Sequence, residues 1–130
     1  MAKVPKSAKR IYAGLKKETL AMHVSVTGLK NIGFIGRIKF WAVAIPAFRA
    51  AKKAEGCLFC ETKMLNGYHH TLTVWVDKNS MMKYRSSTAH LNAMRIFPKI
   101  AYGKIYGWET SSFPTWNDAL KFFNDYAREV

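Results

Sequence analysis

The chain has 130 residues, 49% of them hydrophobic, and a formal net charge of +13 from 21 Lys and Arg against 8 Asp and Glu. This length and composition predict one domain with a sizeable core and exclude a disordered chain. The charge excess invites a nucleic-acid interpretation, but beyond the amino terminus the cations are scattered singly or in pairs, and no known nucleic-acid motif accompanies them. We therefore expect a solvated basic surface and no specific nucleic-acid partner.

Residues 1–20 form a basic amino-terminal arm. Six cations, offset only by Glu18, lie in this stretch: Lys3, Lys6, Lys9, Arg10, Lys16 and Lys17. It has no apolar h-region, so it does not resemble a secretory signal. We expect it to be mobile and dispensable for folding, with a possible weak attraction to anionic membranes, and we place the folded domain at residues 21–130.

The first predicted elements are a strand over residues 22–30 and a helix over residues 37–53. The strand alternates apolar and polar side chains. In the helix an apolar stripe recurs at spacings of three and four residues, and it consists of Ile38, Trp41, Ile45 and Phe48. We expect either a kink at Pro46 or two abutting helical segments there. The apolar stretch over residues 40–48 is too short to span a bilayer, although a surface-bound amphipathic segment remains open.

A second strand is predicted over residues 57–65 and contains the only two cysteines, Cys57 and Cys60. Residues three apart on a regular strand point to opposite faces, so we interpret these thiols as reduced packing residues, which fits a cytoplasmic protein. A zinc site would need two further ligands. Asn66-Gly67 then predicts a tight hairpin turn.

The returning strand, residues 68–77, has two different faces. Leu72, Val74 and Val76 form an aliphatic face that we expect to pack against a helix, whereas Thr71, Thr73 and Trp75 form a face that suits a cavity or an interface.

Three further elements follow this strand. A helix over residues 79–97 is predicted to be capped by Asn79 or Ser80 and stopped by Pro98. A strand over residues 102–109 carries Tyr106 and Trp108 on one face. A last helix is capped by Thr115.

The order strand, helix, strand, strand, helix, strand predicts an α+β fold of the ferredoxin-like β-α-β-β-α-β type, with an antiparallel sheet and an extra C-terminal helix. Right-handed crossovers place both main helices on one face of the sheet. We expect the other face to be uncovered, and therefore a homodimer in which two sheets close into a dimeric α+β barrel.

Several motifs carry a resemblance to a known family over residues 21–128. They are Glu55-Gly56-Cys57-Leu58, the Thr-Leu-Thr-Val-Trp-Val-Asp run that ends at Asp77, the segment from Met82 to Ala89-His90-Leu91-Asn92-Ala93-Met94, Gly107-Trp108, and Pro114-Thr115-Trp116. With these motifs the chain resembles the spheroidene-monooxygenase-like branch of the dimeric α+β barrel superfamily. That superfamily includes antibiotic-biosynthesis monooxygenases and haem-dependent members, and the resemblance implies the fold more strongly than the activity.

The candidate catalytic residues are His90, Trp75 and His23. His90 lies mid-helix between small residues, and it is either a core histidine bonded to backbone, a proton donor to a substrate, or a haem ligand. His23 either faces water or lines the barrel interior. The candidate ligand-binding residues are Thr71, Thr73, Trp41, Tyr106 and Trp108. We interpret Tyr84, Arg85 and Arg95 as a solvated helix face.

Two classes of function stay open from the sequence. The first, which the resemblance implies, is a monooxygenase-type enzyme acting on a hydrophobic small molecule in the barrel cavity, where, as in cofactor-free members of such barrels, the substrate itself would react with oxygen. The second is a non-catalytic protein that binds haem or another hydrophobic ligand. The cofactor is accordingly either none or haem, and the substrate and pathway are not encoded in any motif that we find.

Overall fold

A computed structural model gives the fold of residues 21–31 and 33–129, so the predictions for the arm at residues 1–20 lie outside the described part. The elements follow the predicted order, with an additional break in the second helical region and a short final strand. They are β1 (Met22–Asn31), α2 (Gly33–Lys53), β2 (Cys57–Leu65), β3 (Tyr68–Trp75), α3 (Lys78–Arg85), α4 (Thr88–Ile100), β4 (Ala101–Thr110), α5 (Trp116–Tyr126) and β5 (Arg128–Glu129).

The strands form one antiparallel sheet in the order β2-β3-β1-β4-β5. The first four strands have the ferredoxin-like arrangement that the sequence predicts, and β5, which the sequence did not predict, extends the sheet beyond β4. The hairpin between β2 and β3 turns at Asn66 and Gly67, whose φ angles of 52° and 80° are left-handed. This pair of positive φ values is what a type I′ turn requires, and Asn-Gly is the preferred sequence for it.

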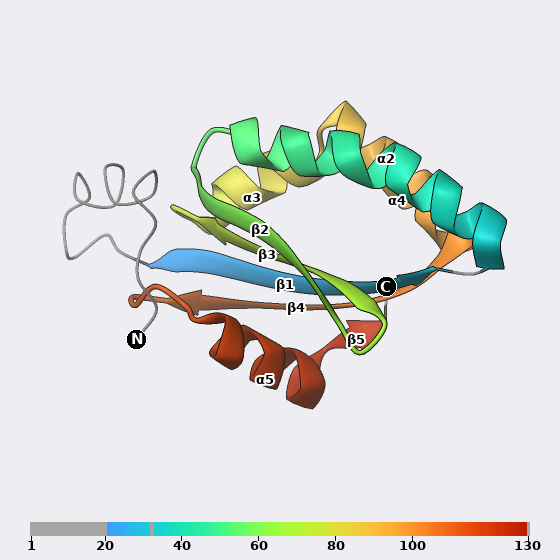
Figure 1. The fold of residues 1–130 in the computed structure, drawn as a ribbon. Coiled ribbons are helices and arrows are strands. Elements are labelled where there is room, and N and C mark those ends of the chain that lie inside the picture. Colours follow the sequence, from blue (N-terminus) through green and yellow to red (C-terminus); the bar gives the residue numbers. More distant parts are fainter. Residues whose placement is uncertain (1–20, 32, 130) are drawn as a thin grey trace.

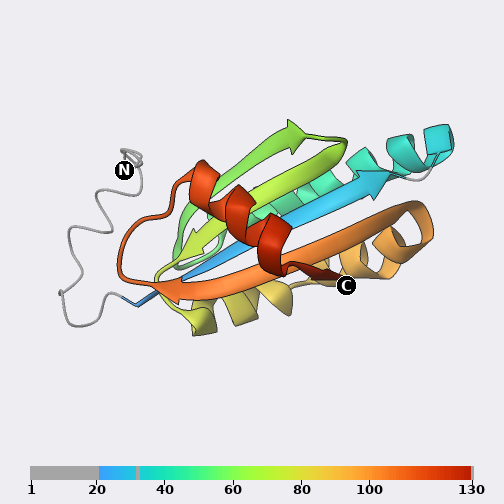
Figure 2. The same ribbon diagram turned by 90° about the horizontal axis from the view of Figure 1, so that it is seen from below.

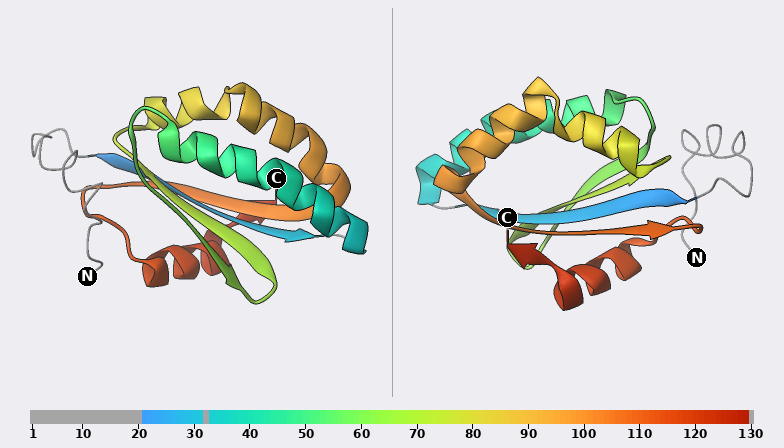
Figure 3. Two further views of the ribbon diagram at one scale, coloured as in Figure 1. Left: turned by 45° about the horizontal axis from the view of Figure 1, so that its top comes forward. Right: turned by 180° about the vertical axis from the view of Figure 1, so that it is seen from behind.

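The sheet separates two helical layers of unequal size. Helices α2, α3 and α4 cover one face, while α5 crosses the other face diagonally (Figures 1 and 2). The view from behind gives the same arrangement, with α5 alone below the sheet (Figure 3). We call the layer of α2, α3 and α4 the helix layer.

The aliphatic face of the sheet packs against α5 and not against the helix layer. Its central residues are at most 1% exposed, and they are Met22, Val24, Val26, Leu72 and Val74. Ala119 and Phe123 of α5 complete this core. Phe123 packs edge-on against His70 with 4.7 Å between ring centroids, and Gly28 gives its ring room, because a Cβ at Gly28 would lie 2.5 Å from the Phe123 Cζ atom.

The prediction of an uncovered sheet face is therefore wrong: α5 covers its centre within one copy of the chain. The predicted homodimer stays a prediction, but an uncovered sheet face no longer supports it. What remains partly open on this side is an aromatic cluster between β4 and α5, composed of Tyr106, Trp108, Phe122 and Tyr126.

The single helix predicted over residues 79–97 is two helices, because Ser86 and Ser87 interrupt it. Asp77, and neither Asn79 nor Ser80, caps α3 by accepting a hydrogen bond of 2.8 Å from the Ser80 amide. Ser87 caps α4 by accepting from the His90 amide at 3.4 Å. Pro98 does not stop α4 but lies in its last turn, which runs on to Ile100.

A register shift in β2 overturns the expectation that the two cysteines point to opposite faces, whereas both are free thiols as predicted. Cys57 pairs with Trp75 and Cys60 pairs with Thr73, with the irregularity between Cys57 and Phe59. Trp75 and Thr73 are two residues apart and share one face of β3, so both cysteines point to that face as well. A bulge inserts one residue and restores the alternation that a spacing of three would otherwise break.

Helix α2 is continuous through Pro46, which lies on its exposed side. The apolar stripe that the sequence predicts is present, but it does not form the buried side of the helix: Ile38 is 60% exposed, Trp41 42% and Ile45 43%. The buried side is built instead from Phe40, Ala47 and Ala51, which pack toward the sheet and α4.

We expect the packing of α5 to be essential for stability. Replacing Phe123 with Ala removes a ring that is 5% exposed and leaves a cavity over His70 and Gly28, so the free energy of unfolding should fall by about 3–5 kcal/mol. Guanidinium denaturation measures this. The control is Tyr126→Ala in the same helix, whose side chain is 59% exposed, and it should cost much less. Equal losses in the two variants would mean that α5 does not seal the core.

Candidate functional site

The candidate site lies between the sheet and the helix layer. Along β1 and β3, alternate side chains point toward the helices, and these are His23, Ser25, Thr27, Thr71, Thr73 and Trp75. Ser25, Thr27 and Thr71 are only half-buried, although they belong to the two central strands and lie beneath helices. Short polar side chains thus form the middle of this surface, where a dry core would carry large aliphatic groups.

Three aromatic rings from three elements meet at one end of this interlayer. Trp75 of β3 is 1% exposed and stacks on Tyr84 of α3, with 5.4 Å between centroids and 27° between planes. His90 of α4 packs edge-on against the same phenol ring at 5.1 Å. The Tyr84 hydroxyl donates a hydrogen bond of 2.8 Å to the carbonyl oxygen of Ala47 in α2. We call Trp75, Tyr84 and His90 the aromatic trio.

Two nitrogen atoms of the aromatic trio are buried without a hydrogen-bond partner among the described residues: Trp75 Nε1 and His90 Nδ1. A buried polar group without a partner costs about 1–3 kcal/mol, and native proteins seldom leave one without a reason. The two nitrogens belong to residues that pack against Tyr84 from different elements.

The environment holds both titratable members of the trio in their neutral forms. Burial lowers the pKa of His90, and the nearby Arg85 guanidinium lowers it further, while a contact with the Arg85 backbone opposes the shift. Burial raises the pKa of Tyr84 to about 12, helped by the neighbouring cysteines. At neutral pH the imidazole is therefore free to accept a proton, and the phenol remains a donor.

His23 lies beside the trio and has its own carboxylate partner. It is the cross-strand neighbour of Trp75 on one side and of Glu109 on the other. Its Nδ1 atom is 2.7 Å from Glu109 Oε1, and its side chain is nearly buried. Gly107 allows this ring position, because a Cβ there would lie 3.3 Å from His23 Nε2. The carboxylate fixes the ring orientation and favours the tautomer with a proton on Nδ1.

The structure brings together most of the residues that the sequence singled out. His90, Trp75 and His23 all face the interlayer, and Thr71 and Thr73 lie on the same face of β3 as Trp75. The two faces of β3 point the opposite way from the prediction. The polar face lies under the helix layer and does not form the wall of an open barrel.

Three predicted ligand-binding residues lie elsewhere. Trp41 contacts His69 at 5.0 Å at the far end of the interlayer, apart from the trio. Tyr106 and Trp108 stack on each other at 5.5 Å on the opposite face of the sheet, next to Phe122 of α5. The prediction that Tyr106 and Trp108 share one pocket with Thr71 and Thr73 is wrong. The pairing of β1 with β4 puts the side chains of Tyr106 and Trp108 on the α5 side of the sheet.

Two residues of the site were missed from the sequence. Tyr84 was assigned to a solvated face, and only the break at Ser86 and Ser87, which turns α4 relative to α3, brings it against His90. Glu109 pairs with His23 through the register of two strands far apart in sequence. Strand alternation alone would have allowed this pair, but nothing in the sequence selects that register.

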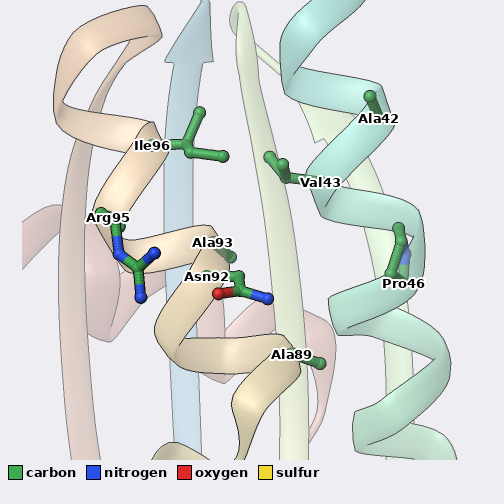
Figure 4. Close-up of a pocket in the computed structure, with 8 residues that line it drawn as sticks. All are labelled: Ala42, Val43, Pro46, Ala89, Asn92, Ala93, Arg95 and Ile96. Atoms are coloured by element: carbon green, nitrogen blue, oxygen red, sulfur yellow. The ribbon is translucent and has the colours of Figure 1, made fainter.

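A cavity of about 270 Å³ lies between α2 and α4. It is lined by Ala42, Val43, Pro46, Ala89, Asn92, Ala93, Arg95 and Ile96. Figure 4 shows these side chains on the facing sides of the two helices, with the sheet behind them. Small residues on both helices create the gap, and Asn92 and Arg95 give it a polar rim. None of the aromatic trio lines this cavity.

The described residues contain no group of three or more His, Cys, Asp or Glu side chains that could hold a metal ion. Haem would need only one axial histidine, and His90 is the candidate. Its Nδ1 atom is enclosed, and the Tyr84 ring lies against the imidazole. With the Tyr84 ring packed against the imidazole, a haem does not fit beside His90 in this closed arrangement, and we derive no step through one.

Neither a family model nor a curated protein matches the sequence. Solved structures do match the fold. A Bacteroides thetaiotaomicron protein of unknown function, suggested to be an oxidoreductase, has a TM-score of 0.61 at 15% identity and covers 70% of this chain and 99% of its own. A mutant of SnoaB, a cofactor-independent oxygenase from Streptomyces nogalater, has a TM-score of 0.61 at 9% identity and covers 72% and 96%.

A proposed antibiotic biosynthesis monooxygenase from Caulobacter crescentus is similar to the same degree. Its TM-score is 0.60 at 14% identity, and the match covers 74% of this chain and 93% of that protein. These likenesses establish the ferredoxin-like α+β fold. At such identities they establish the fold alone. Within the described residues, no helix is both long and apolar enough to cross a membrane.

The lowered pKa values of His70 and His90 predict how stability depends on pH. Burial is the main cause for both, and their ordinary value is 6.5. Between the lowered pKa and about 6.5 the unfolded chain binds more protons than the folded one, so the free energy of unfolding should fall as the pH drops through that window. Denaturation midpoints from neutral to mildly acidic pH measure it. In a double variant, His70→Gln with His90→Gln, the free energy of unfolding should depend less on pH. An unchanged slope of stability against pH would contradict the origin of this dependence in the two histidines.

The cysteines should be slow to react in the folded protein. Burial raises the pKa of Cys57 to about 11 and that of Cys60 to about 12, from an ordinary value of 9.0. The thiolate is the reactive form, so alkylation of Cys57 by iodoacetamide at neutral pH should be about a hundredfold slower than in the unfolded chain. Mass spectrometry of timed samples, with guanidinium-unfolded protein as the control, measures the ratio. Similar rates in both states would mean that these thiols are not enclosed.

Proposed function

We propose that the protein is a small-molecule oxygenase whose hydrophobic substrate binds between the sheet and the helix layer, against the aromatic trio. The observation that carries the proposal is a pair of buried nitrogens with no hydrogen-bond partner in the described part of the chain, Trp75 Nε1 and His90 Nδ1, on two rings that pack against Tyr84. An oxygen atom of a substrate would satisfy the Trp75 N–H, and the neutral His90 imidazole would take a proton from it.

The substrate class follows from the groups that surround the site. Stacked aromatic rings favour a flat, apolar molecule, and the few polar atoms provide orientation without enough charge to hold an ionic one. The half-buried hydroxyls of Ser25, Thr27 and Thr71 would face the polar edge of such a molecule. An aromatic compound with phenolic or keto oxygens, such as a quinol or a polyketide-like ring system, meets these requirements.

A balanced reaction of this class converts an activated CH₂ group to a carbonyl with O₂. His90 would remove one proton and leave an electron-rich anion, stabilised by the Trp75 N–H at the substrate oxygen. The anion reduces O₂ and bonds to it at the same carbon. Loss of water then leaves one oxygen atom in the product carbonyl, and the second oxygen departs with both substrate hydrogens. The likeness in fold to SnoaB, which is a cofactor-independent oxygenase, supports this direct route.

In the structure the trio is closed, because its free nitrogens are not exposed to solvent. Tyr84 must therefore turn aside when a substrate binds. Its hydroxyl bond to the Ala47 carbonyl is the hydrogen bond that holds it there. Closure of this kind would keep water from the anion before it meets O₂. We also propose that the chain belongs to the spheroidene-monooxygenase-like branch, supported by the Thr-Leu-Thr-Val-Trp-Val-Asp and Ala-His-Leu-Asn-Ala-Met motifs.

The test is oxygen consumption by the full-length protein with a dihydroxyanthrone as the probe substrate, followed by absorbance of the quinone product. The His90→Gln variant should lose about 10²-fold or more in rate, which is the usual contribution of a positioned general base. The Trp75→Phe variant keeps most of the ring and loses one hydrogen bond, so it should lose about tenfold.

The matched controls are the same substitutions on the α5 side of the sheet. Trp108→Phe and His70→Gln should leave the rate per folded molecule within about twofold, since neither residue faces the interlayer. Equal losses in controls and site variants would contradict the proposed site. No oxygen uptake above the uncatalysed rate would contradict the oxygenase. A Soret band after expression with added haem would favour the alternative, a haem-binding protein.

A further inference from the structure

The outer surface of the helix layer has an unusual composition that the proposed oxygenase site does not explain. Nine exposed cations lie on α2, α3 and α4: Lys39, Arg49, Lys52, Lys53, Lys78, Lys83, Arg85, Arg95 and Lys99. The sequences of these three helices contain no Asp or Glu. The other side of the sheet is mixed, with Asp118, Lys121 and Asp125 on α5.

Large apolar side chains stand among these cations. On the helix layer, Ile38 is 60% exposed, Leu91 51%, Met82 47%, Ile45 43%, Trp41 42% and Met94 39%. Scattered exposed apolar residues are ordinary, but six on one layer, on helices that carry only positive charge, make a distinct surface. The two kinds of residue alternate along the same helices: Ile45 precedes Arg49 by one turn in α2, and Leu91 precedes Arg95 by one turn in α4.

We infer that the outer surface of the helix layer binds an anionic lipid membrane, lying on it without crossing it. Cations near a membrane surface are attracted to anionic head groups. The exposed isoleucine, leucine and methionine side chains would enter the boundary between head groups and acyl chains. This combination of basic and apolar residues is the one that interfacial helices use.

The charge and the apolar groups of this surface argue against three other binding partners: a second copy of the chain, the arm at residues 1–20, and a nucleic acid. A second copy would place positive charge against positive charge, and the arm at residues 1–20 has the same sign, with six cations against one acid. A nucleic acid would complement the charge, but its phosphate backbone offers little to the aliphatic side chains of Ile38, Ile45 and Leu91. A lipid surface matches both the charge and the apolar groups.

The arrangement of the layer supports a flat contact. Above the sheet, α2 lies beside α4, and α3 leads into α4 along the same row (Figures 1 and 3), so all three helices lie in one layer. Apart from Phe40, the buried inner residues of α2 are the small Ala47 and Ala51, while the large Ile38 and Ile45 lie on its outer side. This inference does not depend on the oxygenase proposal, because it uses none of the residues of the trio.

Co-sedimentation of the full-length protein with vesicles tests the inference. The vesicles are phosphatidylcholine alone, or phosphatidylcholine with one-third phosphatidylserine, at physiological ionic strength. We expect binding only to the anionic vesicles. Two double variants should each weaken it about tenfold or more: Arg49→Gln with Arg95→Gln, which removes two cations, and Ile45→Asn with Leu91→Gln, which removes two apolar groups.

Each double variant has a matched control away from the helix layer. Lys121→Gln with Arg128→Gln removes the same charge from α5 and β5, and Met64→Gln with Leu65→Gln removes two exposed apolar residues from β2. Both controls should bind as the unchanged protein does. All these residues are exposed, so the variants should fold, and circular dichroism verifies it.

Four results would overturn the inference. The first is absence of binding to anionic vesicles. The second is an equal loss of vesicle binding in the helix-layer variants and in their controls, which would mean that the binding depends on net charge alone. The third is binding that depends on the arginines and not on Ile45 and Leu91, together with tighter binding to duplex DNA or RNA, which would assign the surface to nucleic acid. The fourth is an oligomer in light scattering that the helix-layer variants alone convert to a monomer, which would assign it to a second copy.

Discussion

The fold depends on one packing contact, that of α5 against the aliphatic face of β1 and β3. Five side chains at the centre of that face are at most 1% exposed, and only a layer of apolar residues above them could bury them so completely. In many folds of this type a sheet face of this kind would need a second molecule to cover it. Here Ala119 and Phe123, from the same chain, provide the cover. The hydrophobic stabilisation of the sheet is thereby concentrated on the α5 side.

This distribution of packing leaves the opposite face free to carry polar groups. A face that had to supply most of the buried apolar area could not hold Ser25, Thr27, Thr71 and His23 in its centre without a large loss of stability. The helix layer instead packs well at one end, around Phe40, Ile100 and Ala101, and meets aromatic and polar residues at the other. The buried nitrogens of Trp75 and His90 are thus a local cost that the core below the sheet can offset.

The sequence predicts the elements well and their faces poorly, for a physical reason. Periodicity reports that β3 has an aliphatic side and a polar side, but either side can face the helices that follow it in the chain. The decision depends on where α5 packs, and no local signal encodes that. The Asn66-Gly67 turn and the Thr115 cap were predictable because a few adjacent residues determine them. The helix break at Ser86 and Ser87 was not, since serine is also tolerated inside helices and only the caps at Asp77 and Ser87 reveal it.

The same limit applies to the candidate site. His23, Trp75 and His90 could be selected by residue type, but Tyr84 and Glu109 become neighbours of these residues only through a helix break and a strand register. The two cysteines show how one inserted residue changes the sheet face to which a side chain is predicted to point. A strict alternation puts Cys57 and Cys60 on opposite faces, and the bulge between Cys57 and Phe59 puts both on the face of Trp75. Bulges have no reliable sequence signature, so the assignment of faces needed the structure.

Helix α2 links the two surfaces that the helix layer presents. Its outer side carries Ile38, Ile45 and Arg49, and its inner side reaches the aromatic trio through the Ala47 carbonyl, which accepts the Tyr84 hydroxyl. Alanines at 47 and 51 let the helix approach the sheet closely, and they also make its inner contact thin, since a methyl group buries little area. Around Ala47 and Ala51, a force on the outer side of α2 therefore acts on a part of the helix that makes little apolar contact with the sheet. A displacement of its backbone at Ala47 must either carry Tyr84 with it or break that hydrogen bond, so the closed position of the trio depends on where α2 rests.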